Sequence, residues 1–281
     1  MHPVMPFIVG CGRSGNTLLR MMLDSHPDMA IPPETEVVVA GTAGGSDAST
    51  FCDAVAGHWR FGDLHIEPLT WRHRVHGLET FTAANGLREM YRMYAEKFGK
   101  TRYGDKTPYY SAHLPLIAAT FPEARAIHII RDGRDVAASM MPLWFGPPDA
   151  PSMADHWVDV VTRIRSDQHV LPTLDVRYEQ LVLQPAAELG RVLEFCELEW
   201  SDDVLRYYER AGERIAEVTH DAQMTDGTWL APVEQRHRIH RLLNEPPRPD
   251  RIGAWRTQLT SADQAAFEAR AGWLLAELGM R

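Results

Sequence analysis

The chain has 281 residues, of which 44% are hydrophobic and 24% charged, a composition typical of a soluble globular protein with a substantial core. Lysine and arginine number 29 and aspartate and glutamate 38, so the formal net charge of −9 argues against broad binding to nucleic acids or anionic membranes. The three cysteines are far apart and form neither a disulfide framework nor a metal-binding pattern, which favours a reduced, cytoplasmic setting. We see no secretory leader and no apolar run long enough to span a membrane.

The expected elements alternate along the chain between short apolar strands and helices. Strands are expected at 7–9, 102–108 (ending in a polar turn), 124–130 and 174–178. Helices are expected at 17–24, 78–98, 113–121, 136–141, 153–170, 186–194, 201–216 and 261–278, the last capped by Ser261. The glycine- and serine-rich residues 41–49 are expected to form a mobile loop. The polar residues 217–250 are expected to form a lid or a long loop.

Strands separated by helices predict parallel βαβ units. We therefore expect an α/β protein of three layers, P-loop-like, with a central parallel sheet and a helical or loop lid, in a single domain over residues 1–281.

The stretch after the first strand has the layout of a phosphate-binding loop. Three glycines occur within six residues, and helical composition starts at Thr17. Glycines let backbone N–H groups approach an anion, and the helix N-terminus adds a partial positive charge. Arg13 supplies a full charge, but no lysine precedes Thr17, so the loop is not a Walker A motif. By itself it is also compatible with an ordinary strand-to-helix turn.

A second polar stretch follows the strand expected at 124–130. Arg131 falls at the carboxyl end of that strand, where open α/β sheets bind ligands. Ser139 lies eight residues later, about two turns into the next helix. Alone, this stretch is equally compatible with a charged surface turn.

Together these stretches resemble the sulfotransferases. The run 13–17 (Arg-Ser-Gly-Asn-Thr) resembles their 5′-phosphosulfate loop, and Arg131 with Ser139 resembles their 3′-phosphate site. The Lys-Thr-Pro turn at 106–108, the Tyr-Glu-Gln-Leu segment at 178–181 and residues 251–256 resemble further family segments, in family order. The resemblance implies binding of 3′-phosphoadenosine 5′-phosphosulfate through Arg13, Ser14, Gly15, Asn16, Thr17, Arg131, Ser139, Tyr178 and Arg251.

The run from Arg13 continues to Glu34 in the pattern of the tyrosylprotein sulfotransferases and related bacterial enzymes, in which the matching glutamate is the catalytic base. The resemblance implies that Glu34 takes the acceptor proton, that Arg13 and Lys106 meet the leaving phosphate, and that no metal is required. Alternatives remain open here: Glu34 and Lys106 as ordinary surface charges, or His26 as the base rather than part of a helix stop. Cys11 is expected to pack rather than react.

Two positions depart from the tyrosylprotein pattern. Leu143 and Glu36 stand where basic residues are expected, and the acidic side chain would repel an acidic peptide. We therefore expect the acceptor to be the hydroxyl of a neutral or cationic small molecule, a sugar or a lipid, bound by segments 40–75 and 217–250. His220, His237 and His240 show no metal-binding spacing, and the acceptor cleft or solvent is their expected place.

Two other functions stay possible on the sequence, and the oligomeric state is open. A small-molecule kinase with a variant loop is opposed by the missing loop lysine and by the lack of a clear acidic magnesium site after a strand. A non-catalytic nucleotide-binding protein is opposed by the presence of Glu34 and Lys106.

Overall fold

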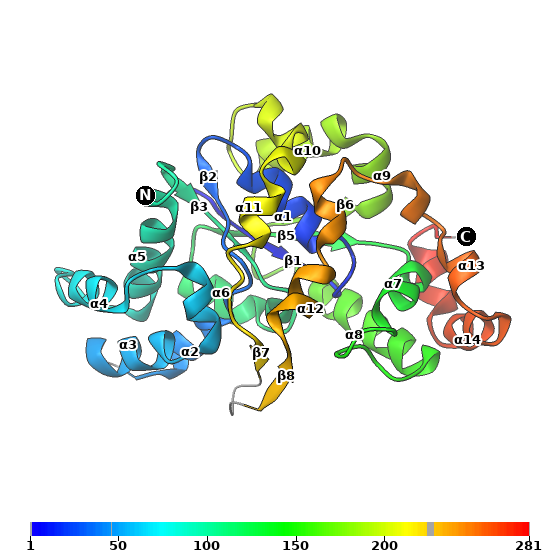
Figure 1. The fold of residues 1–281 in the computed structure, drawn as a ribbon, viewed down its shortest axis with the longest axis horizontal. Coiled ribbons are helices and arrows are strands. Elements are labelled where there is room, and N and C mark those ends of the chain that lie inside the picture. Colours follow the sequence, from blue (N-terminus) through cyan, green and yellow to red (C-terminus); the bar gives the residue numbers. More distant parts are fainter. Residues whose placement is uncertain (1, 46, 224–227, 281) are drawn as a thin grey trace.

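A computed structural model describes residues 2–45, 47–223 and 228–280 (Figure 1). Its central sheet is parallel throughout and has the strand order β4-β1-β5-β6. A second parallel pair joins β2 to β3, and β7 pairs antiparallel with β8. The strands are β1 (Met5–Val9), β2 (Met29–Ala30), β3 (Arg102–Tyr103), β4 (Asp105–Lys106), β5 (Ala124–Ile130), β6 (Thr173–Arg177), β7 (Ala222–Gln223) and β8 (Trp229–Ala231).

Helices flank the sheet and fill most of the chain. The α-helices are α1 (Asn16–Asp24), α2 (Val37–Ala43), α3 (Ala48–Ala56), α4 (Pro68–His76), α5 (Ala83–Glu96), α6 (Leu114–Thr120), α7 (Gly133–Met140), α8 (Ala150–Ser166), α9 (Tyr178–Leu183), α10 (Pro185–Phe195), α11 (Ala211–Ile215), α12 (Val233–Arg238), α13 (Trp255–Gln258) and α14 (Ser261–Glu277). The 3₁₀-helices are η1 (Trp59–Leu64), η2 (Pro108–Ala112), η3 (Asp202–Leu205), η4 (Tyr207–Glu209), η5 (Arg241–Asn244) and η6 (Pro249–Arg251).

Successive side chains of the buried strand β1 point to opposite faces of the sheet, and helices cover both faces, which gives three layers. Phe7 and Val9 pack into one apolar cluster with residues of α2 to α6, whereas Ile8 packs into another with α1, α9 and α10. Both faces of a parallel sheet are covered in this way because each crossover helix packs back on the strands that it joins. A third cluster joins α7, α8 and α14. The predicted three-layer α/β fold with a central parallel sheet is confirmed.

The prediction of a mobile loop at 41–49 is wrong for the described residues, of which Ser46 is not one. Helix α2 extends to Ala43, and α3 starts at Ala48 with Asp47 as its cap, because the Asp47 carboxylate accepts from the backbone N–H groups of Ser49 and Thr50. A Cβ added at Gly41 would lie 2.9 Å from the Phe51 ring. This glycine allows close helix packing and is no sign of a loop.

Other expected boundaries also change. The strand expected at 102–108 divides into β3 and β4, which belong to different sheets, and the helix expected at 201–216 breaks into η3, η4 and α11. The cap of α14 is Thr260, whose hydroxyl accepts from the N–H of Asp263, and not Ser261. The lid at 217–250 contains a hairpin and α12, and Figure 1 shows it in yellow and orange between α2–α5 and α7–α8. None of the helices in the described part of the chain is long and apolar enough to cross a membrane.

Candidate active site

The carboxyl ends of β1, β4 and β5 face a cavity of about 1090 Å³. The glycine loop, the ends of β4 and β5, α7 and the lid all contribute to its lining. Of the site residues predicted from the sequence, all except Ser14 line it: Arg13, Gly15, Asn16, Thr17, Glu34, Lys106, Arg131, Ser139, Tyr178 and Arg251.

The glycine loop is shaped for close approach to a ligand. Gly15 caps α1 with φ +105°, and a Cβ added there would lie 2.6 Å from the Tyr178 ring. No side chain caps the first turn of α1, so its N–H groups face the loop without a side-chain partner. Ser14 Oγ and Asn16 Oδ1 are buried and have no hydrogen-bond partner among the described residues. Since buried polar atoms are normally paired, the Ser14 hydroxyl fits as a donor to an anion such as a phosphate, whereas Asn16 Oδ1 can only accept and does not pair with an anion.

The second predicted stretch meets the first in space. Arg131 donates to the backbone carbonyls of Arg13 (3.1 Å) and Arg251 (2.7 Å), and its guanidinium lies 4.3 Å from the centre of the Tyr178 ring. Arg13 Nε donates to Ser139 Oγ at 3.1 Å. The Nε atoms of Arg131 and Arg251 are buried without a partner in the described structure. Donors of this kind fit a second anionic group near the first.

Glu34 lines the cavity between two cations. Lys106 Nζ is 2.8 Å from its Oε1, and Arg60 Nη2 is 3.2 Å from its Oε2. Two bonds brace the turn that carries it: Thr35 donates through its N–H to Thr107 Oγ1 (3.0 Å) and through its hydroxyl to Asp105 Oδ2 (2.8 Å). Glu34 keeps 28% of its side chain exposed, so a cavity ligand can reach it.

These charges shift the ionisation of the site. Burial acts to raise the pKa of Glu34, but Lys106 and Arg60 outweigh it and hold that pKa well below its ordinary value. Burial and the neighbouring Arg131 lower the pKa of Arg13 to about 10, so Arg13 remains a cation at neutral pH. The site therefore pairs an ionised carboxylate with several cations at neutral pH.

Of the three lid histidines expected in the acceptor cleft or in solvent, His240 lines the cavity, whereas His220 and His237 do not. Burial and the cations of Lys106 and Arg13 hold the pKa of His240 well below the ordinary value, so its imidazole is neutral. His240 lies 134 residues after Lys106, and no spacing in the sequence indicates that the two side chains share a cavity.

The structure gives no catalytic role to His26 as a base or to Cys11 as a reactive thiol. His26 does not line the cavity: its Nε2 is 2.9 Å from the Glu199 carbonyl, and its Nδ1 accepts from the N–H of Asp28. One ring nitrogen thus bonds within the turn after α1 and the other bonds to the Glu199 carbonyl, so neither is available to the cavity. Burial raises the pKa of Cys11 to about 12, so its thiol is not ionised at neutral pH.

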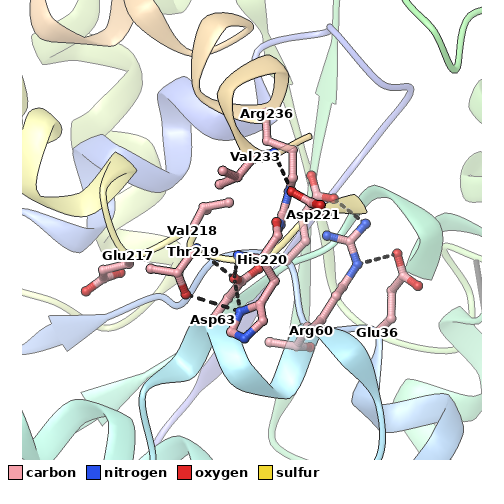
Figure 2. Close-up of polar contacts among 12 residues, drawn as sticks. Glu36, Arg60, Asp63, Glu217, Val218, Thr219, His220, Asp221, Val233 and Arg236 are labelled. Atoms are coloured by element: carbon pink, nitrogen blue, oxygen red, sulfur yellow. Dashed lines mark hydrogen bonds and ion pairs between the residues drawn. The ribbon is translucent and has the colours of Figure 1, made fainter. Parts of the chain in front are cut away.

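The lid is held to η1 by a buried carboxylate, shown in Figure 2. Asp63 is fully buried and accepts from the N–H of Thr219 (3.0 Å) and from Arg236 Nη2 (2.7 Å). His220 Nδ1 also lies 3.1 Å from the same carboxylate. Figure 2 also shows Arg60, from the same short helix, turned toward Glu36.

Several apolar side chains also line the cavity. Segment 40–75 contributes Trp59 and Arg60, while most of its large side chains, such as Phe51 and Trp71, are in the core. The lid contributes Leu230. Sequence reasoning missed the wall after α7, which supplies Leu143, Trp144 and Phe145. No group of three or more histidine, cysteine or acidic side chains suited to a metal ion occurs among the described residues.

Comparisons with known proteins show which family and which fold the chain shares. The profile described as "Sulfotransferase family" matches residues 6–202. A putative protein-tyrosine sulfotransferase of Caenorhabditis briggsae is 27% identical over 216 residues, covering 74% of this chain and 71% of that protein. Nodulation protein NoeE of Sinorhizobium fredii is 28% identical over 302 residues, covering 99% of this chain and 66% of NoeE, so the chain spans slightly less than two thirds of that relative. The sulfotransferase domain of the Synechococcus PCC 7002 olefin synthase has the same fold, with a TM-score of 0.63 at 22% identity over 97% of this chain and 96% of that one.

Proposed function

The chain belongs to the sulfotransferase family, and we propose that it transfers a sulfuryl group from 3′-phosphoadenosine 5′-phosphosulfate to an acceptor hydroxyl. The observation that carries this proposal is the Glu34–Lys106 pair at 2.8 Å, which shares one cavity with the glycine loop and Arg131. A base, a cation for the leaving group and two anion sites are the parts that this transfer needs. A cytoplasmic location and a single domain stay predictions.

The residues that would hold the sulfuryl donor divide into two groups. Arg13, Ser14, Gly15, Asn16 and Thr17 would take the 5′-phosphosulfate, since they form the loop and first turn of α1. Arg131 and Ser139 would take the 3′-phosphate, with Tyr178 and Arg251 beside the nucleoside. The unpartnered donors of Ser14, Arg131 and Arg251 support this assignment.

The side chains fit the chemistry of an in-line transfer. The donor, when bound, supplies a sulfuryl group whose departure leaves negative charge on a phosphate oxygen, as in phosphoryl transfer. Arg13 and Lys106 would neutralise that charge, and one well-placed group of this kind contributes roughly 3–4 kcal/mol. Glu34, ionised in the free enzyme, would accept the proton of the acceptor hydroxyl, an effect of about 10²–10⁴-fold.

For the acceptor we propose a hydroxyl of a small molecule, a sugar or a lipid. The apolar wall formed by Tyr109, Leu143, Trp144, Phe145 and Leu230 supports an acceptor with an apolar face. The argument from Glu36 is weaker than the sequence suggested, because Arg60 pairs with it at 2.8 Å and offsets its charge. We therefore include acidic tyrosine peptides among the acceptors that are tested below.

The test is transfer from labelled donor over an acceptor library containing phenols, sugars, hydroxylated lipids and acidic tyrosine peptides, read by mass spectrometry. We expect a sulfuryl product that is lost in Glu34→Gln and Lys106→Met but kept in Glu194→Gln, which changes an exposed glutamate of α10. Sulfation of the acidic tyrosine peptides alone would overturn the acceptor assignment. Magnesium-dependent ATP turnover without any sulfuryl transfer would overturn the activity itself.

A further inference from the structure

We propose that Arg60 is a positioning residue that holds one carboxylate oxygen of Glu34, so that the base stays oriented while Lys106 serves the leaving group. This inference rests on the proposed role of Glu34. Neither the motifs of the sequence nor the residues compared with the family include Arg60.

The two oxygens of Glu34 have different partners from different elements. Lys106 comes from the end of β4 and contacts Oε1, whereas Arg60 comes from η1 and contacts Oε2. Each oxygen thus has its own cation, and loss of one contact leaves the other in place. If Lys106 leaves Oε1, the contact of Arg60 with Oε2 is enough to keep the carboxylate of Glu34 in the same orientation.

Arg60 is itself fixed before any ligand binds. Its Nε donates to Glu36 Oε1 at 2.8 Å, as Figure 2 shows, and its guanidinium lies 4.3 Å from the centre of the Trp59 ring. Its side chain is only 15% exposed. Contacts on two edges and one face fix the plane of the guanidinium, so little conformational freedom remains to be lost during the reaction.

Lys106 and Arg60 are suited to different roles because their side chains differ in flexibility and in shape. Lys106 has a flexible stem and a point charge, which lets it turn from Glu34 to a leaving oxygen. Arg60 is tied to Glu36, so it cannot follow. A guanidinium also keeps its charge at every working pH, so it favours the ionised form of Glu34 that must be present before the acceptor proton is taken.

The alternative role for Arg60, which lines the cavity, is direct binding of an anionic acceptor. The structure favours positioning, since Glu34 and Glu36 both contact its guanidinium. The two roles differ in their kinetics: an acceptor contact changes KM for anionic acceptors, whereas a positioning contact changes kcat and its pH dependence.

The experiment compares Arg60→Met and Arg60→Lys with the wild-type enzyme by kcat and KM across pH, using whichever acceptor the library yields. In Arg60→Met we expect kcat to fall about 10- to 100-fold and the acid limb of its pH profile to move up by about 1–3 pH units. Arg60→Lys restores most of the acid limb, because it keeps the charge. Arg72→Met, which breaks an ion pair with Asp53 at the surface, is the control and leaves both quantities unchanged.

The outcomes separate this inference from the proposed function. If Glu34→Gln abolishes transfer while Arg60→Met keeps the wild-type kcat and pH profile, the role of Arg60 is wrong and the base assignment stands. A change confined to KM for anionic acceptors likewise contradicts it. If Glu34→Gln keeps full activity, the proposed base fails and the inference about Arg60 fails with it.

Discussion

Arg236 donates a hydrogen bond to Asp63 at 2.7 Å, although 173 residues separate them in the sequence. Asp63 also accepts from the N–H of Thr219, so one carboxylate contacts the lid at two places. It does so from η1, the same short helix that carries Arg60 to Glu34. The position of the lid and the surroundings of Glu34 therefore depend on the same six-residue element.

We predict that Asp63→Asn loosens the lid. It leaves the Arg236 guanidinium without its charged partner in a buried setting, where breaking one side of an ion pair costs about 3–5 kcal/mol. Hydrogen exchange of backbone amides in 217–223 and 228–240 should accelerate. The double variant Asp63→Asn with Arg236→Met should lose less stability than the two single changes added. Asp53→Asn, at an exposed pair, is the control. Unchanged exchange in the lid would contradict the prediction.

Arg131→Met should weaken binding of 3′-phosphoadenosine 5′-phosphate. Loss of a buried guanidinium from an anion site costs about 2–5 kcal/mol, or about 30-fold to several thousand-fold in affinity. Calorimetry should show a much smaller loss for adenosine 5′-phosphate, which has no 3′-phosphate. Arg125→Met is the control. Arg125 lies in β5, the strand that Arg131 follows, but its side chain contacts the Phe195 carbonyl and does not line the cavity, so this variant should bind both nucleotides normally. Equal losses for both nucleotides would place the 3′-phosphate elsewhere.

Gly15→Ala should destabilise the protein and weaken nucleotide binding. The added Cβ meets the Tyr178 ring at 2.6 Å, and φ is +105°, so about 1–3 kcal/mol is expected from the strained backbone alone. Gly190→Ala is the matched control: nothing lies within 4 Å of its Cβ, and inside helix α10 alanine is favoured over glycine by about 0.5–1 kcal/mol. Urea unfolding should therefore move in opposite directions in the two variants.

Acid should remove stability that comes from Asp24. Burial opposes its ionisation, but Arg214 and Lys100 lower the pKa of the folded carboxyl below its ordinary value. The unfolded chain, with a pKa of about 3.9, then binds the proton first, so this stability is present above that pH and is lost as pH falls through the folded pKa. Urea unfolding of wild type and Asp24→Asn should differ by about 3–5 kcal/mol at pH 6. The gap should narrow below about pH 4, and a gap independent of pH would contradict the assignment.

Features set by neighbouring residues could be predicted from the sequence. The apolar runs of β1 and β5, the glycine loop and the first turn of α1 are local patterns, and the structure contains each of them. Gly41 shows where local reasoning failed: glycine in a polar stretch suggested a loop, but the residue packs against Phe51 between helices. Composition does not distinguish a flexible glycine from one required by a close contact.

The sequence by itself therefore determined the fold class, the loop with Arg13 and the presence of a strand-end arginine at 131, because strand, turn and helix signals act over a few residues. Only the tertiary structure decided that Arg60 and His240 lie beside Glu34 and that Asp63 holds the lid. The residues brought together in this way are 26 to 206 positions apart in the sequence (60 − 34 = 26; 240 − 34 = 206). Their proximity follows from how the layers pack, and no local pattern of residues encodes it.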